Sequence, residues 1–596
     1  MSIEQLITKH LDIWTAADTE KKSGRGRSSG NAGSVYGIKK LRELILELAV
    51  RGKLVPQDEN NEPASELLKR IAAENAKLVA EGKIKKSKPL AEITDDEKPF
   101  ELPVGWEWVR LGNICSYIQR GKGPSYVDNS EFIVVSQKCV RWSGLDLSQA
   151  RFIEPESITK YEPVRFLSEG DILWNSTGTG TIGRACIVPT QTSQQVMVAD
   201  SHVTVVRPIG FGSLFLWRWI QSPSVQSKIE GVASGSTNQI ELNTSTVITQ
   251  VLPLPPLAEQ HRIVAKVDEL MALCDQLENQ HNNATEAHEK LVTHLLGTLT
   301  QSQNAEDFNT QWQRISEHFD TLFTTEASID VLKQTLLQLA VMGKLVPQDP
   351  NDEPASELLK RIQAEKAKLI AEGKIKKDKP LAAISDEEKP FELPVGWEWA
   401  RLSELIAGMD SGWSPACLEN KSPSDNVWGV LKTTAVQIMQ YLEQENKELP
   451  DKLTPRPEAE AKVGDILFTR AGPTNRVAIS CLVEATRKKL MISDKIIRFH
   501  PIEMGIDGHF LVLCLNTGAT AAYLEKAKSG MAASQVNISQ EKLRSAPIPL
   551  PPLKIQKLIV SKVVEMTAIC DHLKGRLTES NELQQKLADT LVEQVI

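Results

Sequence analysis

Long apolar runs and clustered cysteines are both missing from this sequence. No segment approaches the roughly 18 apolar residues that a membrane-spanning helix needs, and the N-terminal stretch MSIEQLITKHLDIW lacks the basic and then apolar pattern of a signal peptide. The 8 cysteines are scattered over 596 residues without a C-x-x-C pair, which argues against a disulfide framework or a zinc cluster. We therefore expect a cytoplasmic protein with reduced thiols and no membrane association.

Recognisable catalytic motifs are missing as well. The chain has no Walker A loop, no N-P-P-Y tetrapeptide of the kind found in adenine methyltransferases, no H-E-x-x-H and no evident pairing of a nucleophile with a base. We therefore predict no catalytic residues and no metal ligands.

An overall excess of positive charge is a third absence, because the net charge is -8. The charge is unevenly distributed. Residues 109–250 carry about 12 basic and 11 acidic side chains, and residues 400–545 carry about 18 and 17, so both segments are near +1. Binding to phosphates depends on local Lys and Arg. The overall acidity therefore does not exclude nucleic-acid binding by these two segments.

What the chain does contain is a duplication. Residues 53–108 recur as residues 344–399 without a gap, with about 47 of 56 positions identical. The similarity resumes downstream, where LPLPPLAEQHRIVAKVDELMALCDQL (252–277) is echoed by IPLPPLKIQKLIVSKVVEMTAICDHL (548–573). Upstream, the first copy has a Gly/Ser-rich basic insertion, and we expect its residues 21–34 to form a flexible loop. The chain is therefore a tandem of two halves, about 1–300 and 301–596.

Between the repeated segments lie two stretches of about 145 residues that are barely alike. Both contain short β-branched runs separated by turn residues, such as EFIVVS, DILWN, RACIV and HVTVV in the first and NVWGVL, DILFT, VAISCLV and KIIRFH in the second. These runs predict mixed sheets, with helices over 214–229 and 509–527. We expect LPVGWEW, present in both copies, to lead into the first strand of each stretch, with its tryptophans packing in the core rather than stacking on bases.

After each PLPPL motif the apolar residues follow the period of a coiled coil. The first stripe comprises Ile263, Val267, Leu270, Cys274, Leu277, His281, Ala284, His288, Leu291 and Leu295, and the second comprises Ile559, Val563, Met566, Cys570, Leu573, Leu577, Leu587 and Leu591. A helix over 258–300 would be about 64 Å long at 1.5 Å per residue. The two stripes can bury each other. His281 and His288 share a side and could bind a metal, but no Cys, Asp or Glu accompanies them at ligand spacing, so we interpret them as coiled-coil positions.

A shorter helix is predicted at SELLKRIAAENAKLVAEG, with Ser65 as its N-cap and Gly82 just past its end. Leu67, Leu68, Ile71 and Leu78 would share one face. The basic tails KIKKSKP and KIKKDKP that follow in the two copies could contact phosphates or could be solvated linkers.

The segment from Gly178 to Gly183 has the G-x-G-x-x-G spacing of dinucleotide-binding loops. That fingerprint requires the glycines to open a helix, whereas Arg184-Ala-Cys-Ile-Val predicts a strand. The second half has FTRAGPTNRVAISC at this position and lacks the pattern. We therefore expect a polar loop of a β-hairpin and no bound nucleotide.

The side chains of these two loops are short hydrogen-bonding groups and guanidinium groups, which suit contacts with base edges and phosphates, although a solvated loop has a similar composition. The candidates for DNA contact are Asn175, Ser176, Thr177, Thr179, Thr181 and Arg184 in the first half and Thr469, Arg470, Thr474, Asn475 and Arg476 in the second.

The chain resembles the specificity (S) subunit of a type I restriction-modification system. The features that carry the resemblance are the tandem halves, the entry motif LPVGWEW, the exit motif PLPPL with its long helix, the GDIL strands, and the Ser-Gly tracts SGSTNQIELN and SGMAASQVNIS. The KLVPQD repeat resembles the subgroup with a long N-terminal conserved region, whereas FTRAGPTN departs from the family's glycine spacing. The implied fold is α+β, with two mixed α/β target-recognition domains joined by two long antiparallel coiled-coil helices in a pseudo-twofold tandem repeat. The expected domains are an N-terminal conserved region (1–100), recognition domain 1 (101–256), a central conserved region (257–390), recognition domain 2 (391–551) and a C-terminal spacer helix (552–596).

The resemblance also implies a function. Each recognition domain would read one half-site of a bipartite target in double-stranded DNA with a nonspecific gap of fixed length. Two methyltransferase (M) subunits and restriction (R) subunits would dock on the chain, and these partners would bind S-adenosylmethionine, ATP and Mg, so the chain itself would need no cofactor. DNA contact is carried over to further residues in the matching segments: Arg120, Lys122, Ser125, Tyr126, Gln137, Lys138, Ser236, Thr237, Asn238 and Gln239, and Ser411, Trp413, Lys432, Thr433, Ser534 and Gln535.

Two other classes of function remain open. One is a scaffold that binds proteins, not DNA, through two divergent β-rich modules, and the other is an independent enzyme. If the chain retained a duplex carrying two separated half-sites in preference to scrambled DNA, the DNA-binding specificity subunit would be favoured over the protein scaffold.

Overall fold

The computed structural model describes residues 3–16, 35–86, 88–178, 180–190, 196–232, 241–302, 305–377, 379–502 and 505–596. The insertion at 21–34 lies outside these ranges. The chain divides into two compact units, one formed by Met1–Ala284 with Ser580–Ile596 and the other by Thr285–Glu579. Each unit is described by itself below.

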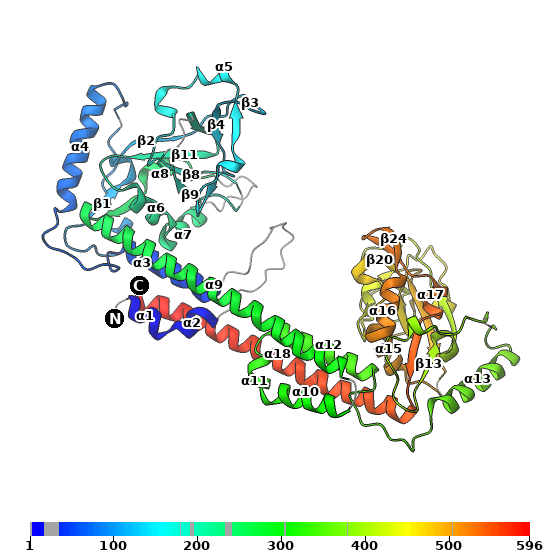
Figure 1. Cartoon of the computed structure of the whole chain (residues 1–596). Helices are drawn as coiled ribbons and strands as arrows, with labels where there is room; N and C mark the ends of the chain where they lie inside the picture. The colour runs from blue at the N-terminus through cyan, green and yellow to red at the C-terminus, as the bar shows by residue number, and fades with distance from the viewer. Residues whose placement is uncertain are drawn as a thin grey trace. The chain divides into compact units, whose positions relative to one another are not determined.

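The first unit contains mixed helices and sheets, as predicted (Figure 1). One four-stranded sheet has the order β2-β11-β8-β9, a second has the order β10-β4-β7-β3, and β1 pairs with β12. The strands are β1 (Glu107–Arg110), β2 (Cys115–Arg120), β3 (Tyr126–Val127), β4 (Phe132–Val135), β5 (Val140–Arg141), β6 (Gly144–Leu145), β7 (Arg151–Ile153), β8 (Ile172–Asn175), β9 (Ala185–Ile187), β10 (Val196–Ala199), β11 (Val203–Pro208) and β12 (Val251–Leu254). The helices are α1 (Ile3–Lys9), α2 (Leu11–Ala16), α3 (Tyr36–Val50), α4 (Ala64–Ala80), α5 (Pro155–Ile158), α6 (Ser213–Gln221), α7 (Pro223–Val232), α8 (Thr244–Thr249) and the first part of α9 (Leu257–Gln301).

The second unit repeats this plan around a sheet of order β14-β23-β19-β21. Its strands are β13 (Glu398–Arg401), β14 (Ile406–Ser411), β15 (Gly429–Leu431), β16 (Val436–Gln437), β17 (Gln440–Tyr441), β18 (Asn446–Glu448), β19 (Ile466–Thr469), β20 (Ala471–Gly472), β21 (Ser480–Leu482), β22 (Leu490–Met491), β23 (Ile496–Pro501), β24 (Ser529–Ala532), β25 (Gln535–Asn537) and β26 (Pro547–Leu550). Its helices are α10 (Ala305–Glu317), α11 (Phe319–Leu322), α12 (Glu326–Val341), α13 (Ala355–Ala371), α14 (Leu402–Leu405), α15 (Gly508–Asn516), α16 (Gly518–Ala527), α17 (Gln540–Arg544) and most of α18 (Leu553–Val595).

The entry and exit motifs of each divergent stretch are partners in the fold. β1 pairs antiparallel with β12, and β13 pairs in the same way with β26. Trp106 and Trp397 are each 5% exposed, which confirms that they pack in the core. Trp108 and Trp399 pack against Phe100 and Phe391 in equivalent tilted arrangements, with ring centroids 5.0 and 5.3 Å apart and ring planes at 57° and 58°. The repeated sequence therefore encodes a closed frame into which each divergent stretch is inserted.

A buried arginine holds the frame of the second unit together. Arg401 donates to both carboxylate oxygens of Glu388 at 2.7 and 2.8 Å and to the backbone oxygen of Ser545 at 2.6 Å. Its remaining donors reach the backbone oxygens of Ala382 and Ala383. The hydrogen bonds that Glu388 accepts, first from Arg401 and then from the Ser385 N–H at 2.9 Å, hold its pKa at about 2, well below its usual 4.5. Arg110 makes the same contacts with Glu97, Ala91, Glu92 and Thr249 in the first unit.

The two long helices pack against each other within both units. In the first unit, Leu270 and Cys274 of α9 share a core with Ala588 of α18, and in the second unit Val292 and Leu296 of α9 share a core with Cys570. Early residues of α9 therefore meet late residues of α18 and vice versa, so the two helices run antiparallel, as expected. The predicted bounds, 258–300 and from 552 onward, differ from the observed ones by one residue.

The predicted apolar stripes are wrong at one distal residue of each helix, whereas Leu295 and Leu591 farther along pack partly buried against the cores, as predicted. Leu291 is 49% exposed and Leu587 is 50% exposed, whereas their neighbours Val292 and Ala588 are buried. An α-helix has 3.6 residues per turn, so a stripe drawn at a period of 3.5 drifts by about 20° per heptad. After three heptads the drift moves the buried line onto the next residue. The shift occurs at equivalent positions of α9 and α18.

Three local predictions need correction. The helix at SELLKRI begins at Ala64 with Pro63 as its N-cap, so Ser65 lies inside it. The segments 214–229 and 509–527 are each two helices, because Pro223 starts α7 and Gly518, with φ of 67°, starts α16. Gly82 does follow α4 with φ of 69°.

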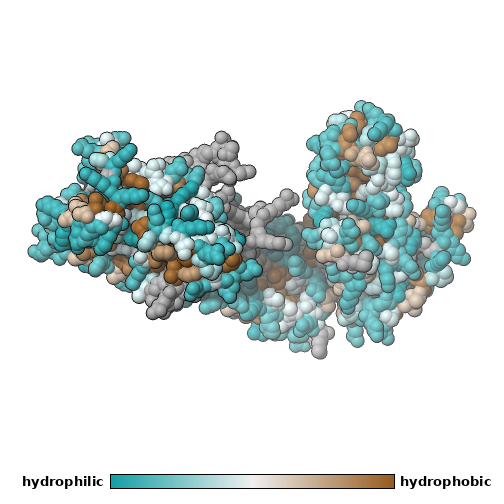
Figure 2. Space-filling view, turned by 90° about the horizontal axis from the view of Figure 1, so that it is seen from above, coloured by the Kyte–Doolittle hydropathy of each residue, from teal (hydrophilic) through white to brown (hydrophobic). Residues whose placement is uncertain are grey.

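The space-filling view shows a mostly hydrophilic surface with small apolar patches (Figure 2). In the described part of the chain, no helix has the length and apolar content needed to cross a membrane.

Candidate nucleic-acid interface

Several strand ends converge at one edge of the first unit. Because β11 runs antiparallel to both β2 and β8, the start of β11 lies beside the ends of β2 and β8. The end of β4 joins them, since Asp200 donates its N–H to the backbone oxygen of Val135 at 3.0 Å. We call this set of strand ends, with the described residues of the segments 120–123, 136–139, 176–178 with 180–184, and 200–202, the first loop edge. It collects side chains from four distant parts of the sequence.

The glycine-rich segment of this edge is the loop of the β8–β9 hairpin, as predicted. Asn175 donates its N–H to the backbone oxygen of Arg184 at 2.8 Å, and Gly183 donates to the backbone oxygen of Asn175 at 3.0 Å. Gly178, Gly180 and Gly183 have φ of 99°, 79° and 80°, a region that side chains with a Cβ rarely adopt. The glycines are thus required by the turn. Strand β9 follows them directly, so these glycines do not open a helix.

The second unit builds the same edge with a different loop. Arg470 donates its N–H to the backbone oxygen of Lys495 at 2.9 Å, as Ser176 does to that of His202 at 2.9 Å. β20 then pairs with β25, which brings the Ser-Gly tract of this half against the loop. In the first unit, Thr177 is bridged to Glu241, which lies in the C-terminal part of the corresponding tract. We call the segments 411–414, 432–434, 470–476, 493–495 and 533–535 the second loop edge.

Some predicted contact residues present exposed or half-exposed side chains. Asn475, Ser534 and Gln535 are exposed on the second loop edge, and Arg470 is half-exposed with no side-chain partner among the described residues. In the first unit, the exposed residues include Tyr126 on the adjacent strand β3. The Arg151 guanidinium lies over the Tyr126 ring, 3.8 Å from its centroid. The exposed members of the predicted set are Lys122, Ser125, Tyr126, Lys138, Ser411, Asn475, Ser534 and Gln535.

Other predicted residues brace the loops from within. Ser176 and Thr469 are fully buried, and the Thr469 hydroxyl donates to the backbone oxygen of Ile479 at 3.2 Å. Asn175 is also buried and donates to the backbone oxygen of Gln137 at 3.1 Å. Arg476 donates to the backbone oxygens of Thr433 and Val436 at 2.8 and 2.9 Å.

Further members of the predicted set make similar local contacts. Gln137 accepts from the Thr181 hydroxyl at 3.3 Å, the Arg184 guanidinium donates to the backbone oxygen of Gly180 at 3.0 Å, and the Thr474 hydroxyl donates to the backbone oxygen of Ala533 at 3.0 Å. Side chains of these types shape the loops by satisfying backbone groups.

Three predicted residues already have charged or aromatic partners. Arg120 pairs with Glu241, and Lys432 pairs with Glu445 at 2.8 Å. Trp413 packs beside a hydrophobic core with the Arg456 guanidinium 4.4 Å from its ring. The remaining predicted residues, Thr179, Ser236, Thr237, Asn238 and Gln239, lie outside the described residues.

Sequence reasoning missed two basic residues at equivalent places. His202 and Lys495 directly precede the central strands β11 and β23, and both are exposed. His202 Nδ1 lies 2.7 Å from the Thr177 hydroxyl, whereas the Lys495 ammonium has no partner among the described residues. Alignment of the runs HVTVV and KIIRFH could have identified the pair, because each run begins with one basic residue, His202 or Lys495.

A third missed residue adds positive charge to the first loop edge. Burial, together with the nearby charge of Arg141, lowers the pKa of Arg184. Arg141 comes from the β5–β6 hairpin and is only weakly paired, 3.9 Å from Asp146. An anion bound beside both guanidinium groups would relieve their repulsion, which is the chemistry of a phosphate contact.

No group of three or more His, Cys, Asp or Glu side chains within the described ranges has the geometry of a metal site. His288 instead lies 3.2 Å from the backbone oxygen of Thr321.

Comparisons with known proteins agree on one family. Residues 103–287 and 444–584 match the family described as the type I restriction modification DNA specificity domain. The chain is 53% identical over 601 residues to the type I restriction enzyme EcoEI specificity subunit of Escherichia coli, covering 100% of this chain and 99% of the relative. It is 40% identical over 623 residues to the EcoAI specificity subunit of Escherichia coli, with 100% of both chains covered.

Solved structures give weaker matches. One is from a study of complex assembly and conformational transition of the type I R-M system, with a TM-score of 0.45 and 18% identity over 83% of this chain and 99% of that chain. Another is the HsdS subunit of Thermoanaerobacter tengcongensis, with a TM-score of 0.40 and 19% identity over 84% of this chain and 98% of that chain.

The two tandem matches and the full-length identities fit the duplicated frame and its two divergent inserts. They place the chain among specificity subunits, as predicted, and not among the catalytic subunits. The chain belongs to the family of type I restriction enzyme specificity subunits.

Proposed function

We propose that this chain reads a bipartite DNA target, with one half-site at each loop edge and a nonspecific gap between them. The observation that carries the proposal is that two equivalent edges, built on the same strand framework, present different side chains. A scaffold recognising one protein partner twice would keep its two contact surfaces alike. Two edges that differ suit two different base sequences.

The roles of the predicted residues divide by exposure. The exposed groups, together with His202 and Lys495, contact bases and phosphates. The buried and bracing groups, such as Ser176, Thr469 and Arg476, set the loop shapes that select those contacts. Exposed Lys and Arg side chains contribute affinity that depends on salt, and short polar side chains contribute base preference.

The chain would also direct catalytic partners to the target. In this proposal two methyltransferase subunits and the restriction subunits dock on it, and they bind S-adenosylmethionine, ATP and Mg. The chain contributes position and sequence choice, and its partners contribute the chemistry.

DNA binding by the chain with its methyltransferase subunits tests the proposal. The target is obtained by sequencing methylated adenines in cells that carry the complete system. The complex is expected to retain the split target over a duplex with both half-sites scrambled, and more weakly as salt rises. Equal retention of the two duplexes at every salt concentration would favour the protein scaffold.

A lysine substitution sharpens the test. Lys495→Met is expected to weaken binding to target and scrambled duplex alike and to lower the slope of log affinity against log salt by about 0.9. Lys452→Met is the control, because Lys452 is an exposed lysine of the same unit outside the segments that form the second loop edge. An unchanged slope in Lys495→Met would remove Lys495 from the interface.

A further inference from the structure

Each divergent insert contains a short hairpin that follows one segment of its loop edge. In the first unit, β5 and β6 are joined by Trp142 and Ser143. In the second unit, β16 and β17 are joined by Ile438 and Met439. We call these two pairs of residues the first and the second hairpin tip. Both tips lie outside the near-identical repeat, so that repeat does not account for their common position.

The backbone closes the two hairpins in the same way. Asp146 donates its N–H to the backbone oxygen of Cys139 at 2.8 Å. Leu442 donates its N–H to the backbone oxygen of Ala435 at 2.9 Å. Each of these hydrogen bonds encloses six residues with the tip at their centre. Two sequences with little in common therefore place a two-residue tip at the same point of the fold.

The tips carry large apolar side chains that remain exposed. Trp142 is 40% exposed, Ile438 is 63% exposed and Met439 is 38% exposed. Val140 and Val436, two residues before Trp142 and Ile438, are fully buried. Each hairpin thus packs on its own unit through its strands and leaves its tip partly uncovered. Exposed apolar side chains at equivalent places in both units indicate a surface that is covered in a complex.

The second tip also holds an unfavourable backbone conformation. Met439 has φ of 58°, a region that side chains with a Cβ rarely adopt. The conformation is held by its N–H, which donates to the backbone oxygen of Ser480 at 3.0 Å. Glycine would suit this position without strain, so a methionine here points to a use for its side chain.

Positive charge lies beside both hairpins. In the first unit, burial and then the nearby charge of Arg141, the last residue of β5, lower the pKa of Arg184. In the second unit, Arg476 donates to the backbone oxygen of Val436 at 2.9 Å and to the side-chain oxygen of Gln437 at 3.1 Å. Arg184 and Arg476 belong to the two loop edges. Each hairpin is therefore held beside an arginine of its loop edge, which places the tip next to DNA bound there.

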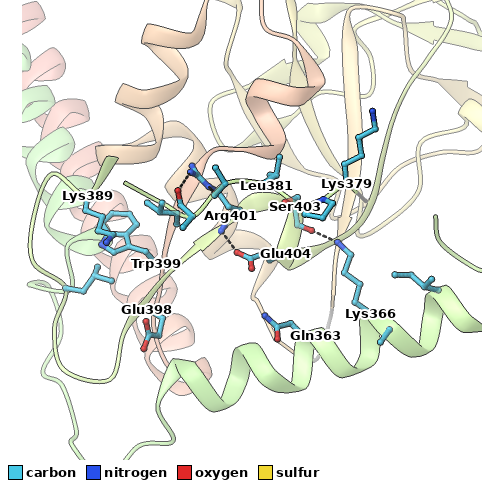
Figure 3. A pocket seen from close by; sticks show the side chains of 17 residues that line it. Gln363, Lys366, Lys379, Leu381, Lys389, Glu398, Trp399, Arg401, Ser403 and Glu404 are labelled. Carbon is cyan, nitrogen blue, oxygen red and sulfur yellow. Dashed lines mark hydrogen bonds between the residues drawn. The ribbon is translucent and has the colours of Figure 1, made fainter. Parts of the chain in front are cut away.

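The shape of a hairpin tip limits what it can contact. In the repeated sequence, Leu381, Leu393 and Trp399 line an open groove of about 790 Å³ beside α13 (Figure 3). A groove receives part of another molecule, whereas a hairpin tip enters one. DNA offers a place for such a tip, because stacked base pairs can separate and admit an apolar side chain between them. Isoleucine and methionine are inserted in this way by DNA-bending proteins, and tryptophan stacks on bases.

We propose that the two hairpin tips act as wedges, each inserting its apolar side chains between two base pairs of the half-site that its unit reads. The inserted side chain unstacks that step and bends the duplex, so a step that separates easily is favoured. Each tip thereby adds base preference without a hydrogen bond to a base. The arginines beside both tips favour a polyanion over an apolar protein surface. The inference rests on the proposed function, because it places one half-site at each loop edge.

Fluorescent base analogues test the proposal. The chain in complex with its methyltransferase subunits is mixed with duplexes of the methylated target. In each duplex, 2-aminopurine replaces one adenine or 6-methylisoxanthopterin replaces one guanine, so that every base pair is covered in turn by its purine. Both analogues brighten when they lose their stacked neighbours. One step in each half-site is expected to brighten.

Variants of the tips assign the two signals. Trp142→Ala is expected to return the signal of one half-site to the level of the free duplex and to weaken target binding about tenfold. Ile438→Ala combined with Met439→Gly is expected to do the same in the other half-site, and glycine suits the backbone at that position. Trp142→Phe keeps an aromatic ring and should retain the signal.

The control variants remove exposed apolar side chains elsewhere in the same units. Leu214 follows the end of β11 and Val463 precedes the start of β19, whereas the loop edges lie at the opposite ends of these strands. Leu214→Ala and Val463→Ala are expected to leave both signals unchanged. The methylated adenines serve as an internal standard, because a methyltransferase moves its target base out of the stack whichever tip is altered.

Two results would overturn the inference while the proposed function stands. One is specific retention of the target with no brightened step apart from the methylated adenines. The other is a brightened step that persists in both tip variants or is lost equally in the controls. Equal retention of the target and a scrambled duplex would instead contradict the proposed function, on which the inference rests.

Discussion

At the scale of single residues, the frame depends on polar groups that the repeat preserves. Arg401 is buried, and the oxygens it binds come from three separate segments of the chain. A guanidinium suits this place because it offers five donors in one plane. Removing it would take the guanidinium donors away from Glu388 and from several backbone oxygens. The divergent insert can therefore vary while its frame stays closed.

The carboxylate partner makes part of this stability depend on pH. The pKa of Glu388 is held at about 2, below the value near 4.5 expected in the unfolded chain, because Arg401 donates to the charged form. Its stabilising contribution is fully present above pH 4.5 and is lost as the pH falls toward 2.

We therefore expect Glu388→Gln to lower the free energy of unfolding at neutral pH and to flatten its pH dependence across that window. Urea unfolding at a series of pH values measures both effects. Glu387→Gln is the control, since Glu387 is exposed and makes no ion pair in the described structure. The same slope in both variants would contradict the role of the pair.

At the scale of elements, the sequence predicted features that depend on neighbouring residues, such as strands. It did not predict features that depend on the exact helical period over many turns or on which strands pair. The eight strand runs quoted from the two inserts form strands, because β-branched runs between turn residues suit sheets. Leu291 and Leu587, in the distal parts of the long helices, were wrongly assigned to the buried face, because a small error in period grows along the helix. The loop edges were found only in part. His202 and Lys495 lie far in sequence from the glycine loops, and only strand pairing brings them together.

The buried face of α9 predicts that alanine substitutions at Leu296 and Leu291 differ in their effect on stability. Leu296 is 1% exposed and lies in a core with Leu322 and Leu339, whereas Leu291 is 49% exposed. Leu296→Ala removes a buried side chain and is expected to destabilise the second unit by about 3 kcal/mol. Leu291→Ala should change stability by about 0.5 kcal/mol or less. Urea unfolding followed by far-UV circular dichroism compares the two variants. If Leu291→Ala were the more damaging change, the heptad assignment made from the sequence would be the correct one.

At the scale of the whole molecule, the duplication assigns different tasks to different surfaces. The frame, with the repeated residues 53–108 and 344–399, is nearly the same in both halves, whereas the loop edges share a framework but not their side chains. The glycine loop of the first edge and the Arg470–Arg476 loop of the second both follow a strand that pairs with the central strand of the sheet. In the proposed function, the repeated frame binds identical partner subunits, and the two differing loop edges contact different base sequences.

This division predicts the result of exchanging one insert. Residues 400–545 begin with the last two residues of β13 and end just before β26 within the second unit, and their core is built largely from their own strands and helices. Replacing them with the corresponding segment of a relative of different specificity should preserve folding, since β26 and the start of β13 remain and the incoming segment supplies the end of β13 again. One half-site of the methylated sequence is expected to change and the other to stay the same, as read by sequencing methylated adenines in cells. A reciprocal exchange of residues 109–250 should alter the other half-site only. If either exchange changed both half-sites, each edge would depend on the other unit, and the assignment of one half-site to each edge would be wrong.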